Sequence, residues 1–410
     1  MPKETIITGL DVGTSNIRVV VGKIKEDNPK PNIIGAVCVP NFGMRKGIVV
    51  SVDEVSKRIR KAIKEASEFS GHSIKKVYLS VGGAHISCCH SKGVVAVSRA
   101  DGEISQEDVK RAIQAASAVS IPSNRETLHI IPLNFAVDKE IVKDPIGMTG
   151  IRLEVDTLII YGFTPYVKNL IKAVTSSGLE ISQMAVAPLA SAYSVLNDHQ
   201  KELGVLLLDI GGGTSGISVF EEGEMIYSHI LPVGSAHITN DIAIGLRSDI
   251  DTAEKVKTEY GWATSYEVNK KDMLDLSKIS KEKGKVSLFE VSQIIEARLS
   301  EILELTNKVL KKVDRAGLLP AGVVLTGGGA KIRGLVDLAK RELKLPVQLG
   351  FPLPLNGLID KVDDPGFATA LGLIFLAKEN LKTKREEKII SSLIKLPFGK
   401  IKRILKGFLP

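Results

Sequence analysis

The sequence predicts an α/β protein of two lobes, with a small inserted module and a separate C-terminal amphipathic helix. Three observations predict this architecture. The chain has 410 residues, which is too long for one ordinary core. The same phosphate-binding turn occurs near the start of each half, as Asp11 to Ser15 and again as Asp209 to Ser215. The net charge of +8 is concentrated in the last thirty residues, where nine bases outnumber two acids.

Each of these turns lies between two short apolar runs, which predicts a strand–turn–strand hairpin in each half. Glycines let backbone N–H groups approach an anion, hydroxyls add donors, and an aspartate can hold a hydrated Mg²⁺. A single Asp-x-Gly turn is ordinary hairpin chemistry. The duplication is therefore what predicts a nucleotide clamped between the lobes.

The first half begins with strands up to about Val50. A capping box at Ser51 and Glu54 opens a helix that Gly71 ends. A strand at 77–81 follows. From 84 to about 164 the pattern changes to strand-like runs around one helix capped by Ser105, which predicts an inserted α+β module of roughly 80 residues.

The second half repeats the hairpin and continues into a helix-rich stretch at 249–318. Its long amphipathic helix opens at a capping box of Ser287 and Glu290, and we expect Gly317 to close it. A strand at 323–325 leads into three glycines. Asp364 and Pro365 then open a helix of small residues, which would allow close packing on a neighbouring helix.

These pieces, in this order, resemble the actin-like nucleotide-binding superfamily, which has a ribonuclease H-type, two-lobed ATPase fold. Within it they resemble the FtsA family of bacterial cell-division proteins. The string from Asp144 to Val155 is the most family-specific, and the module after Ile86 is similar to the family's inserted 1C subdomain. The resemblance implies these bounds: subdomain 1A at 1–83, 166–190 and 359–380; 1C at 84–165; 2A at 191–248 and 319–358; 2B at 249–318; a basic linker at 381–395; and a membrane-targeting helix at 396–410.

The resemblance also implies ATP and Mg²⁺ as ligands and a set of residues that bind them. Asp11 and Asp209 would hold Mg²⁺ through water. Glu254 and Lys257 would contact the ribose and base, although without the other motifs this pair is typical of a solvated helix face. The implied nucleotide-binding residues are Asp11, Gly13, Thr14, Ser15, Arg18, Asp209, Gly211, Gly212, Gly213, Thr214, Glu254, Lys257, Gly327, Gly328 and Gly329.

One position departs from the pattern of relatives that hydrolyse ATP. Some of them carry a glutamate before the proline that opens the helix preceding the second phosphate turn, and that glutamate positions the attacking water. This chain has Ala187 before Pro188. An alanine cannot accept a proton or orient a water. We therefore name no catalytic residue and expect slow ATP hydrolysis at most.

The C-terminal segment has a clear helical phase, with an apolar face and basic flanks. This pattern is typical of a helix that lies in a membrane interface, and a helix docked on the protein's own core is the alternative. The membrane-binding residues we expect are Phe398, Lys400, Ile401, Lys402, Arg403, Ile404, Leu405, Lys406, Phe408 and Leu409. No apolar run is long enough to span a bilayer.

The resemblance implies the partners and the location. We expect self-association into filaments, binding of the FtsZ C-terminal peptide on 249–318, contact with later division proteins through 84–165, and attachment to anionic lipids on the cytoplasmic face of the membrane at the septum. Nucleic acid is not expected, because the positive charge belongs to one appendage. Two alternatives stay open: a PilM-like pilus-assembly protein, and a sugar or carboxylate kinase of the same superfamily.

Overall fold

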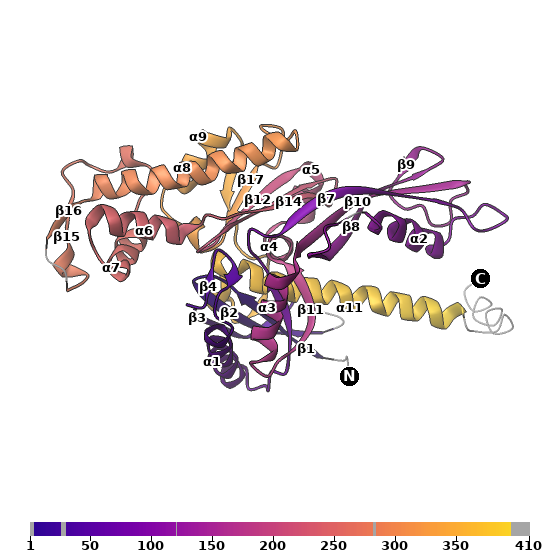
Figure 1. Cartoon of the computed structure of the whole chain (residues 1–410), viewed down its shortest axis with the longest axis horizontal. Coiled ribbons are helices and arrows are strands. Elements are labelled where there is room, and N and C mark those ends of the chain that lie inside the picture. The colour runs from indigo at the N-terminus through magenta and orange to yellow at the C-terminus, as the bar shows by residue number, and fades with distance from the viewer. Residues whose placement is uncertain (1–3, 26–29, 120, 282–283, 395–410) are drawn as a thin grey trace, which may run out of the picture.

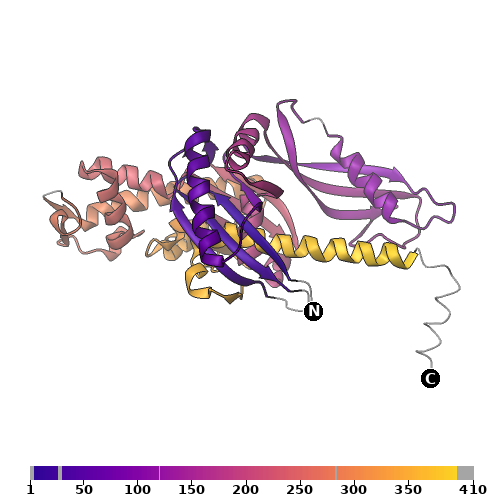
Figure 2. The same cartoon turned by 90° about the horizontal axis from the view of Figure 1, so that it is seen from below.

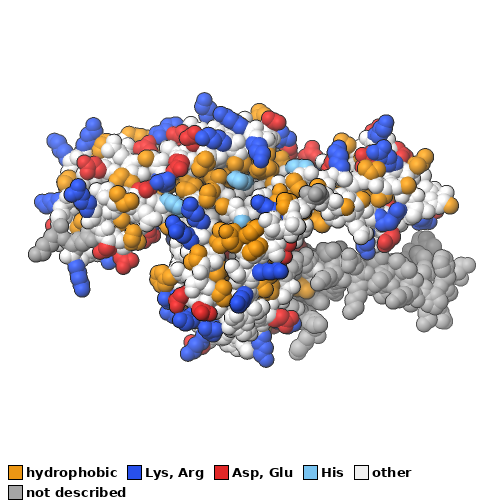
Figure 3. Space-filling model, in the orientation of Figure 1, with side chains coloured by type: hydrophobic (Ala, Val, Ile, Leu, Met, Phe, Trp, Pro, Cys, Tyr) orange, Lys and Arg blue, Asp and Glu red, His pale blue; other side chains and the backbone are white. Residues whose placement is uncertain are grey.

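The computed structural model describes residues 4–25, 30–119, 121–281 and 284–394, with side chains described up to Leu381. Two large β-sheets form the body, and two arms extend from it in opposite directions (Figure 1). One arm is the helix-rich part of the second half, and the other is the inserted module. Hydrophobic side chains gather near the middle of the face in Figure 3, whereas charged side chains are spread over both arms.

The first sheet has six strands in the order β11-β6-β1-β2-β3-β19. β1 and β2 form the first hairpin, in which Asp11 pairs with Arg18. α1 and α3 lie on one face of this sheet, and α11 (Ala368–Ile394) packs on the other. The strands are β1 (Thr5–Val12), β2 (Asn16–Ile24), β3 (Asn32–Pro40), β6 (Lys76–Val81), β11 (Glu180–Val186) and β19 (Asn356–Gly357), and the helices are α1 (Val52–Ser70) and α3 (Thr164–Thr175).

The second sheet repeats five of the six strands of the first, and among the described strands only the edge strand β19, which pairs in parallel with β3, has no counterpart in it. Its order is β14-β13-β12-β17-β18. In both sheets, two antiparallel pairings are followed by two parallel ones. The duplication predicted from the two turns is thus confirmed in the topology. The strands are β12 (Val205–Ile210), β13 (Ser215–Glu221), β14 (Glu224–Leu231), β17 (Val323–Thr326) and β18 (Val347–Leu349).

The inserted module is a four-stranded antiparallel sheet, β7-β10-β8-β9, covered by one helix. Ser105 and Asp108 form the predicted capping box of that helix. Gly93 is required where the helix crosses β7, because a Cβ there would lie 2.0 Å from the carbonyl oxygen of Ala112. The elements are β7 (Ser87–Ala96), α2 (Gln106–Ser117), β8 (Arg125–Val137), β9 (Glu140–Val142) and β10 (Arg152–Phe163).

The helix-rich arm is built around α8 (Leu288–Lys312), which starts at the predicted cap, Ser287. The helix ends at Lys312 and not at Gly317, so the predicted end was wrong. Arg315 N–H bonds to the Leu310 carbonyl in the turn that follows, and Gly317 lies beyond it with φ +72°. The other elements are α6 (Ser235–Leu246), α7 (Ile250–Lys255), a π-helical turn (Val256–Tyr260), β15 (Met273–Asp275), β16 (Lys285–Ser287) and α9 (Leu335–Leu343).

Two helices cross between the lobes, α4 (Ala187–Val195) and α11 (Ala368–Ile394). α11 follows a 3₁₀ turn at Pro365–Phe367 and continues through the basic stretch at 381–394. It leaves the body on the side of the inserted module (Figure 2). The predicted membrane helix at 396–410 lies outside the described residues. Among the described helices, none is both long enough and apolar enough to span a bilayer.

Four short elements complete the fold: β4 (Met44–Arg45), β5 (Ile48–Val49), α5 (Asp198–Leu203) and α10 (Ile359–Val362). The first two form a small hairpin beside the first phosphate turn, where the Gly47 N–H donates to Thr14 Oγ1 at 2.9 Å. This contact fixes the hydroxyl of the turn against the first lobe.

Candidate nucleotide site

The first turn is held in shape by its own backbone and by a neighbouring side chain. Gly13 N–H donates to the Asn16 carbonyl at 3.0 Å, and Asn41 Nδ2 donates to the Gly13 carbonyl at 2.8 Å. A Cβ at Gly13 would stand 2.8 Å from the Asn16 oxygen, so the close turn requires glycine.

The second turn is tied to the first residues of α6. Gly211 N–H closes the turn on Thr214 O, and Ser235 and Ala236 donate their N–H groups to Gly211 and Gly212 at 2.8 Å each. A Cβ at Gly234 would stand 2.5 Å from the Gly211 oxygen. The helix start therefore lies directly against the turn.

The two turns meet across the space between the lobes. A Cβ at Gly212 would stand 2.1 Å from Ser15 Oγ, and one at Gly213 would stand 2.6 Å from Thr14 Oγ1. Only glycine allows this approach. The structure therefore brings together two predicted motifs that lie 198 residues apart in sequence.

The two aspartates lie half-buried at the ends of equivalent strands, and each accepts a hydroxyl hydrogen bond. Ser80 Oγ donates to Asp11 Oδ1 at 2.6 Å, and Ser191 Oγ donates to Asp209 Oδ2 at 2.6 Å. Burial raises the pKa of both carboxyls, and the hydroxyl partners and Arg18 offset part of that rise. A buried carboxylate with a raised pKa is a group that a cation would stabilise.

Arg18 extends from β2 toward the second lobe. Its guanidinium carbon lies 5.7 Å from the centre of the Phe367 ring, and its Nη2 lies 3.0 Å from where a Cβ of Gly366 would stand. The same nitrogen is 3.9 Å from the corresponding point on Gly328. The structure thus places the positively charged guanidinium of Arg18 between the first turn and the glycine loop.

Glu254 and Lys257 form an ion pair at the base of α6. Lys257 Nζ lies 2.6 Å from Glu254 Oε2 and 2.8 Å from Thr239 Oγ1, and its side chain is 6% exposed. Lys257 is thus not part of a solvated helix face, whereas the side chain of Glu254 is 50% exposed. Lys257 Nζ also donates to the Ser235 carbonyl at 3.4 Å.

The glycine loop completes the site through Ser235. A Cβ at Gly329 would stand 3.0 Å from the Cβ of Ser235, and one at Gly327 would stand 2.3 Å from Asp209 Oδ1. Gly327 has φ +85°, which strongly favours glycine. All of the predicted nucleotide-binding segments therefore adjoin one another, with Ser235 touching the second turn, the glycine loop and Lys257.

Sequence reasoning missed four hydroxyl residues that hold these groups: Ser80, Ser191, Ser235 and Thr369. Ser80 had a usable signal, because β6 runs parallel to β1 and its Leu79 pairs with Leu10. Asp11 follows Leu10 and Ser80 follows Leu79, so this register places Ser80 beside Asp11. No local signal marks Thr369, whose Oγ1 reaches Asp209 Oδ2 at 3.2 Å from 160 residues away.

Solved structures with similar folds define the class. PilM in the PilM–PilN type IV pilus biogenesis complex superposes with a TM-score of 0.65 at 18% identity, covering 90% of this chain and 97% of that one. MreB5 of Spiroplasma citri bound to ADP gives a TM-score of 0.54 at 15% identity, covering 93% and 98%. These identities are low, so the likeness establishes the fold alone: the chain has an actin-like fold.

Sequence comparisons identify the family. The family model for cell division protein FtsA matches residues 206–372, and the model for the SHS2 domain inserted in FtsA matches residues 83–161. FtsA of Bacillus subtilis is 37% identical over 384 residues, which span 93% of this chain and 86% of the relative. FtsA of Pseudomonas aeruginosa is 35% identical over 371 residues, which span 90% and 88%. The chain belongs to the FtsA family of cell-division proteins.

Proposed function

We propose that this protein is an ATP-dependent scaffold that forms filaments and anchors FtsZ filaments to the cytoplasmic face of the membrane at the division septum. The observation that carries the proposal is the meeting of two equivalent phosphate turns, each with a half-buried aspartate whose pKa is raised, between duplicated lobes. Family membership supports the division role over pilus assembly and over a kinase.

The residues present fit a nucleotide with a hydrated Mg²⁺. Backbone N–H groups and hydroxyls of the two turns would bind phosphates, and Asp11 and Asp209 would hold the metal through its waters. Lys257, Glu254 and the glycines at 327–329 would take the adenosine. MreB5 of Spiroplasma citri, which shares this fold, has been solved bound to ADP and to AMPPNP. When bound, Mg²⁺ supplies charge that offsets the burial of the two carboxylates.

The contact between the two turns limits how a nucleotide can enter the site. Thr14 and Ser15 lie against Gly213 and Gly212, so the lobes must move apart to accept phosphate between them. We infer that nucleotide binding is coupled to lobe opening. Titration with a fluorescent ATP analogue, with Mg²⁺ or with EDTA, tests binding directly, and no saturable binding in either condition would overturn the nucleotide site.

Hydrolysis should be slow. Ala187, at the start of α4, supplies no carboxylate for a water, and its carbonyl accepts from the Ser191 hydroxyl. A steady-state ATPase assay should give turnover well below 1 s⁻¹. A rate on the order of 1 s⁻¹ or more, typical of a working enzyme, would contradict this proposal.

We place the FtsZ peptide on the helix-rich arm, in a groove between α8, which belongs to the expected stretch 249–318, and α6, which precedes that stretch. The groove has a volume of about 430 Å³ and combines apolar residues with one basic side chain, Arg298, which is paired with Asp241. Ile244 lines it and is 77% exposed, and together with Ile294 and Ala297 it forms an apolar patch, which favours a partner. The remaining lining residues are Gly245 and Glu301.

Peptide binding tests this placement. Ile244→Glu should weaken binding of a labelled FtsZ C-terminal peptide at least tenfold by fluorescence anisotropy. Ile250→Glu introduces the same change at an exposed isoleucine outside the groove and should have little effect. Equal loss in both variants, or in neither, would remove the groove from the proposal.

The membrane role rests on the sequence of residues 396–410, which lie outside the described residues. Each base near an anionic leaflet contributes about 1 kcal/mol, so the four bases from Lys400 to Lys406 give on the order of 4 kcal/mol before ordering costs. One tail should therefore bind weakly, and many tails along a filament should bind tightly.

Co-sedimentation with anionic vesicles tests the anchor. With ATP present, the full chain should pellet and a chain ending at Lys395 should not. Leu405→Glu should abolish pelleting, whereas Gly399→Glu, which adds the same charge off the apolar face, should weaken it only modestly. Equal pelleting of the full and shortened chains would refute the tether.

We propose that the inserted module, residues 84–165, contacts later division proteins. Its outer end exposes several large apolar side chains, among them Ile141 and Ile151 at 76% and 80%. A double variant, Ile141→Glu with Ile151→Glu, should lose binding to those proteins while keeping affinity for ATP. We further assign subdomains 1A, 2A and 2B to the bounds given above.

A further inference from the structure

Asp209 is linked by hydroxyl groups to both helices that cross between the lobes. Ser191 on α4 donates to Asp209 Oδ2 at 2.6 Å, and Thr369 on α11 donates to the same oxygen at 3.2 Å. The two hydroxyl oxygens lie 2.9 Å apart. Ser191 is fully buried and Thr369 is 7% exposed, so no solvent replaces these bonds.

The two hydroxyls have fewer protons than acceptors. Ser191 Oγ also lies 2.9 Å from the Ala187 carbonyl on its own helix. Two protons therefore face three acceptors: Asp209 Oδ2, the Ala187 carbonyl and the other hydroxyl. When Asp209 is charged and no metal ion is bound, Ser191 donates to its carboxylate. If the carboxylate instead accepts hydrogen bonds from the waters of a hydrated Mg²⁺, Ser191 can donate to the Ala187 carbonyl and Thr369 can donate to the Ser191 hydroxyl.

The helices that carry these hydroxyls touch through their backbones. A Cβ at Gly372 would stand 1.7 Å from the Ala190 carbonyl oxygen. One turn along α4, Ser194 Oγ donates to the Ala368 carbonyl at 2.6 Å. The first turn of α11 is thus fixed to α4 beside Asp209, and the crossing can act as a pivot.

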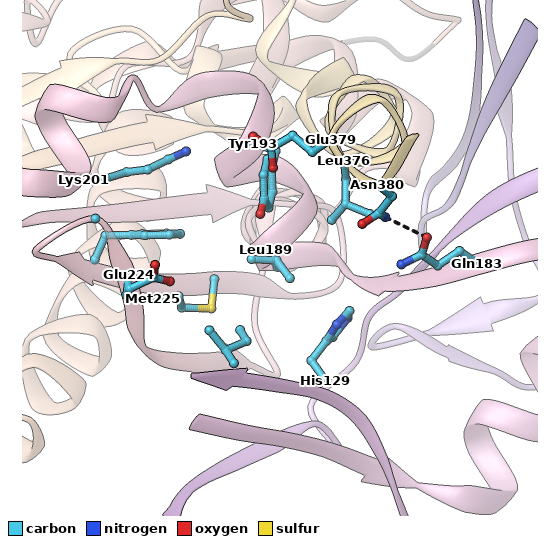
Figure 4. A pocket seen from close by; sticks show the side chains of 13 residues that line it. His129, Gln183, Leu189, Tyr193, Lys201, Glu224, Met225, Leu376, Glu379 and Asn380 are labelled. Carbon is cyan, nitrogen blue, oxygen red and sulfur yellow. Dashed lines mark hydrogen bonds between the residues drawn. The ribbon is translucent and has the colours of Figure 1, made fainter. Parts of the chain in front are cut away.

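The far part of α11 has room to move. A cavity of about 230 Å³ separates its side chains from the β13–β14 hairpin and from His129 of the inserted module (Figure 4). Leu376 and Ala377 of α11 are buried, so the room lies beyond them, where two polar contacts reach across: Asn380 Nδ2 donates to Gln183 Oε1 at 2.8 Å, and Tyr193 forms a hydrogen bond with Glu379. Leu376 and Leu189 line the apolar part of the cavity.

We propose that Ser191 and Thr369 are positioning residues that couple the charge at Asp209 to the orientation of α11. The inference rests on the proposed binding of nucleotide and Mg²⁺ at Asp209. Because α11 has 27 residues, it spans about 40 Å from this site toward the C-terminal segment. A small rotation at the pivot therefore becomes a large displacement at residues 381–394.

Hydrogen–deuterium exchange on the full chain tests the coupling. The chain is saturated with ATP, once with Mg²⁺ and once with EDTA, so that differences in affinity do not enter. In the wild type, Mg²⁺ should change amide exchange in α11 beyond Leu376 at least threefold. Ser191→Ala and Thr369→Val should each reduce that change by more than half.

Three comparisons keep the test sharp. Thr369→Ser retains the hydroxyl and should restore the response, which separates coupling from poor folding. Ser56→Ala removes another buried hydroxyl, one that bonds to the Ala173 carbonyl and to neither α11 nor Asp209, and it should keep the response. A full response in Thr369→Val, or an equal loss in Ser56→Ala, would overturn the inference. A wild type that binds ATP without any response of α11 would overturn it alone, whereas absence of ATP binding would overturn the proposed function.

Discussion

Gly372 of α11 lies against Ala190 of α4 so closely that the backbones of the two helices are in contact. A Cβ at Gly372 would stand 1.7 Å from the Ala190 oxygen and 2.4 Å from its carbonyl carbon, and neither atom belongs to a side chain that could turn away. Because backbone meets backbone at this crossing of α4 and α11, its geometry matters for stability and for motion.

Gly372→Ala should therefore destabilise the protein even though alanine is the better helix former. Overpacking costs about 1–3 kcal/mol or more, against a helix-propensity gain of about 1 kcal/mol. Urea unfolding should show a net loss of about 2 kcal/mol. Gly245→Ala in α6 is the matched control, because its Cβ would meet only Ile294 Cδ1, the end of a flexible side chain. Wild-type stability in Gly372→Ala would show that the crossing can relax.

Asp209→Asn should keep the stability of the free protein but weaken its binding of Mg-ATP. Burial raises the pKa of this carboxyl, so the folded state disfavours its charged form at pH 7, and removing the charge should leave the free energy of unfolding equal or higher. The same change removes a predicted Mg²⁺ partner. Thermal shifts should show stabilisation of the wild type by saturating Mg-ATP, about 2.7 kcal/mol at a hundred times Kd. Asp209→Asn should lose most of it.

Asp360→Asn is the control for that experiment, since Asp360 is an exposed residue of α10 far along the chain from either turn. It should keep the full ligand-induced shift. If Asp209→Asn were stabilised by Mg-ATP as strongly as the wild type, Asp209 would have no part in metal binding.

Lys257 should contribute to nucleotide affinity, whereas its neighbour Lys255 should not. Lys257 is buried against Glu254 and Thr239 beside Ser235, but Lys255 reaches away to the Ile279 carbonyl. Lys257→Met should raise the Kd for a fluorescent ATP analogue at least tenfold, which corresponds to about 1.4 kcal/mol. Lys255→Met should change it less than twofold. Similar effects of the two substitutions would return Glu254 and Lys257 to a structural role.

The parts of this fold that could be predicted from sequence are those set by short-range chemistry. The caps at Ser51, Ser105 and Ser287 each open a helix as expected, and both hairpins form around their glycine turns. The end of α8 was missed, because the chain turns at Arg315 before it reaches a glycine that could cap the helix.

The hydroxyl residues that bond to the two aspartates could not be predicted from short-range chemistry. Ser191 and Thr369 touch each other across 178 residues, and each is an ordinary residue in its own helix. Their meeting depends on the crossing of α4 and α11, which only the complete topology determines. Ser80 could have been inferred from the parallel pairing of β6 with β1, since strand register places it beside Asp11.

His129 should make the junction between the inserted module and the first lobe sensitive to acid. Its Nε2 accepts a hydrogen bond from Val186 N–H at 3.1 Å, and burial lowers its pKa to about 4 from an ordinary 6.5. A lowered pKa in the folded protein means that, as the pH falls, His129 of the unfolded chain binds a proton at a higher pH than His129 of the folded protein. Stability is therefore full above pH 6.5 and falls as the pH drops toward 4, by about 3 kcal/mol for this group.

His129→Gln removes the titrating group but keeps an acceptor near Nε2, so the fall in unfolding free energy between pH 7 and pH 5 should be smaller than in the wild type. Part of the pH dependence should remain, because burial also lowers the pKa of His85 to about 4. His199→Gln, at an exposed position, should follow the wild-type curve. Urea unfolding at the two pH values measures the difference, and identical pH dependence in His129→Gln and the wild type would show that protonation of His129 does not limit stability in acid.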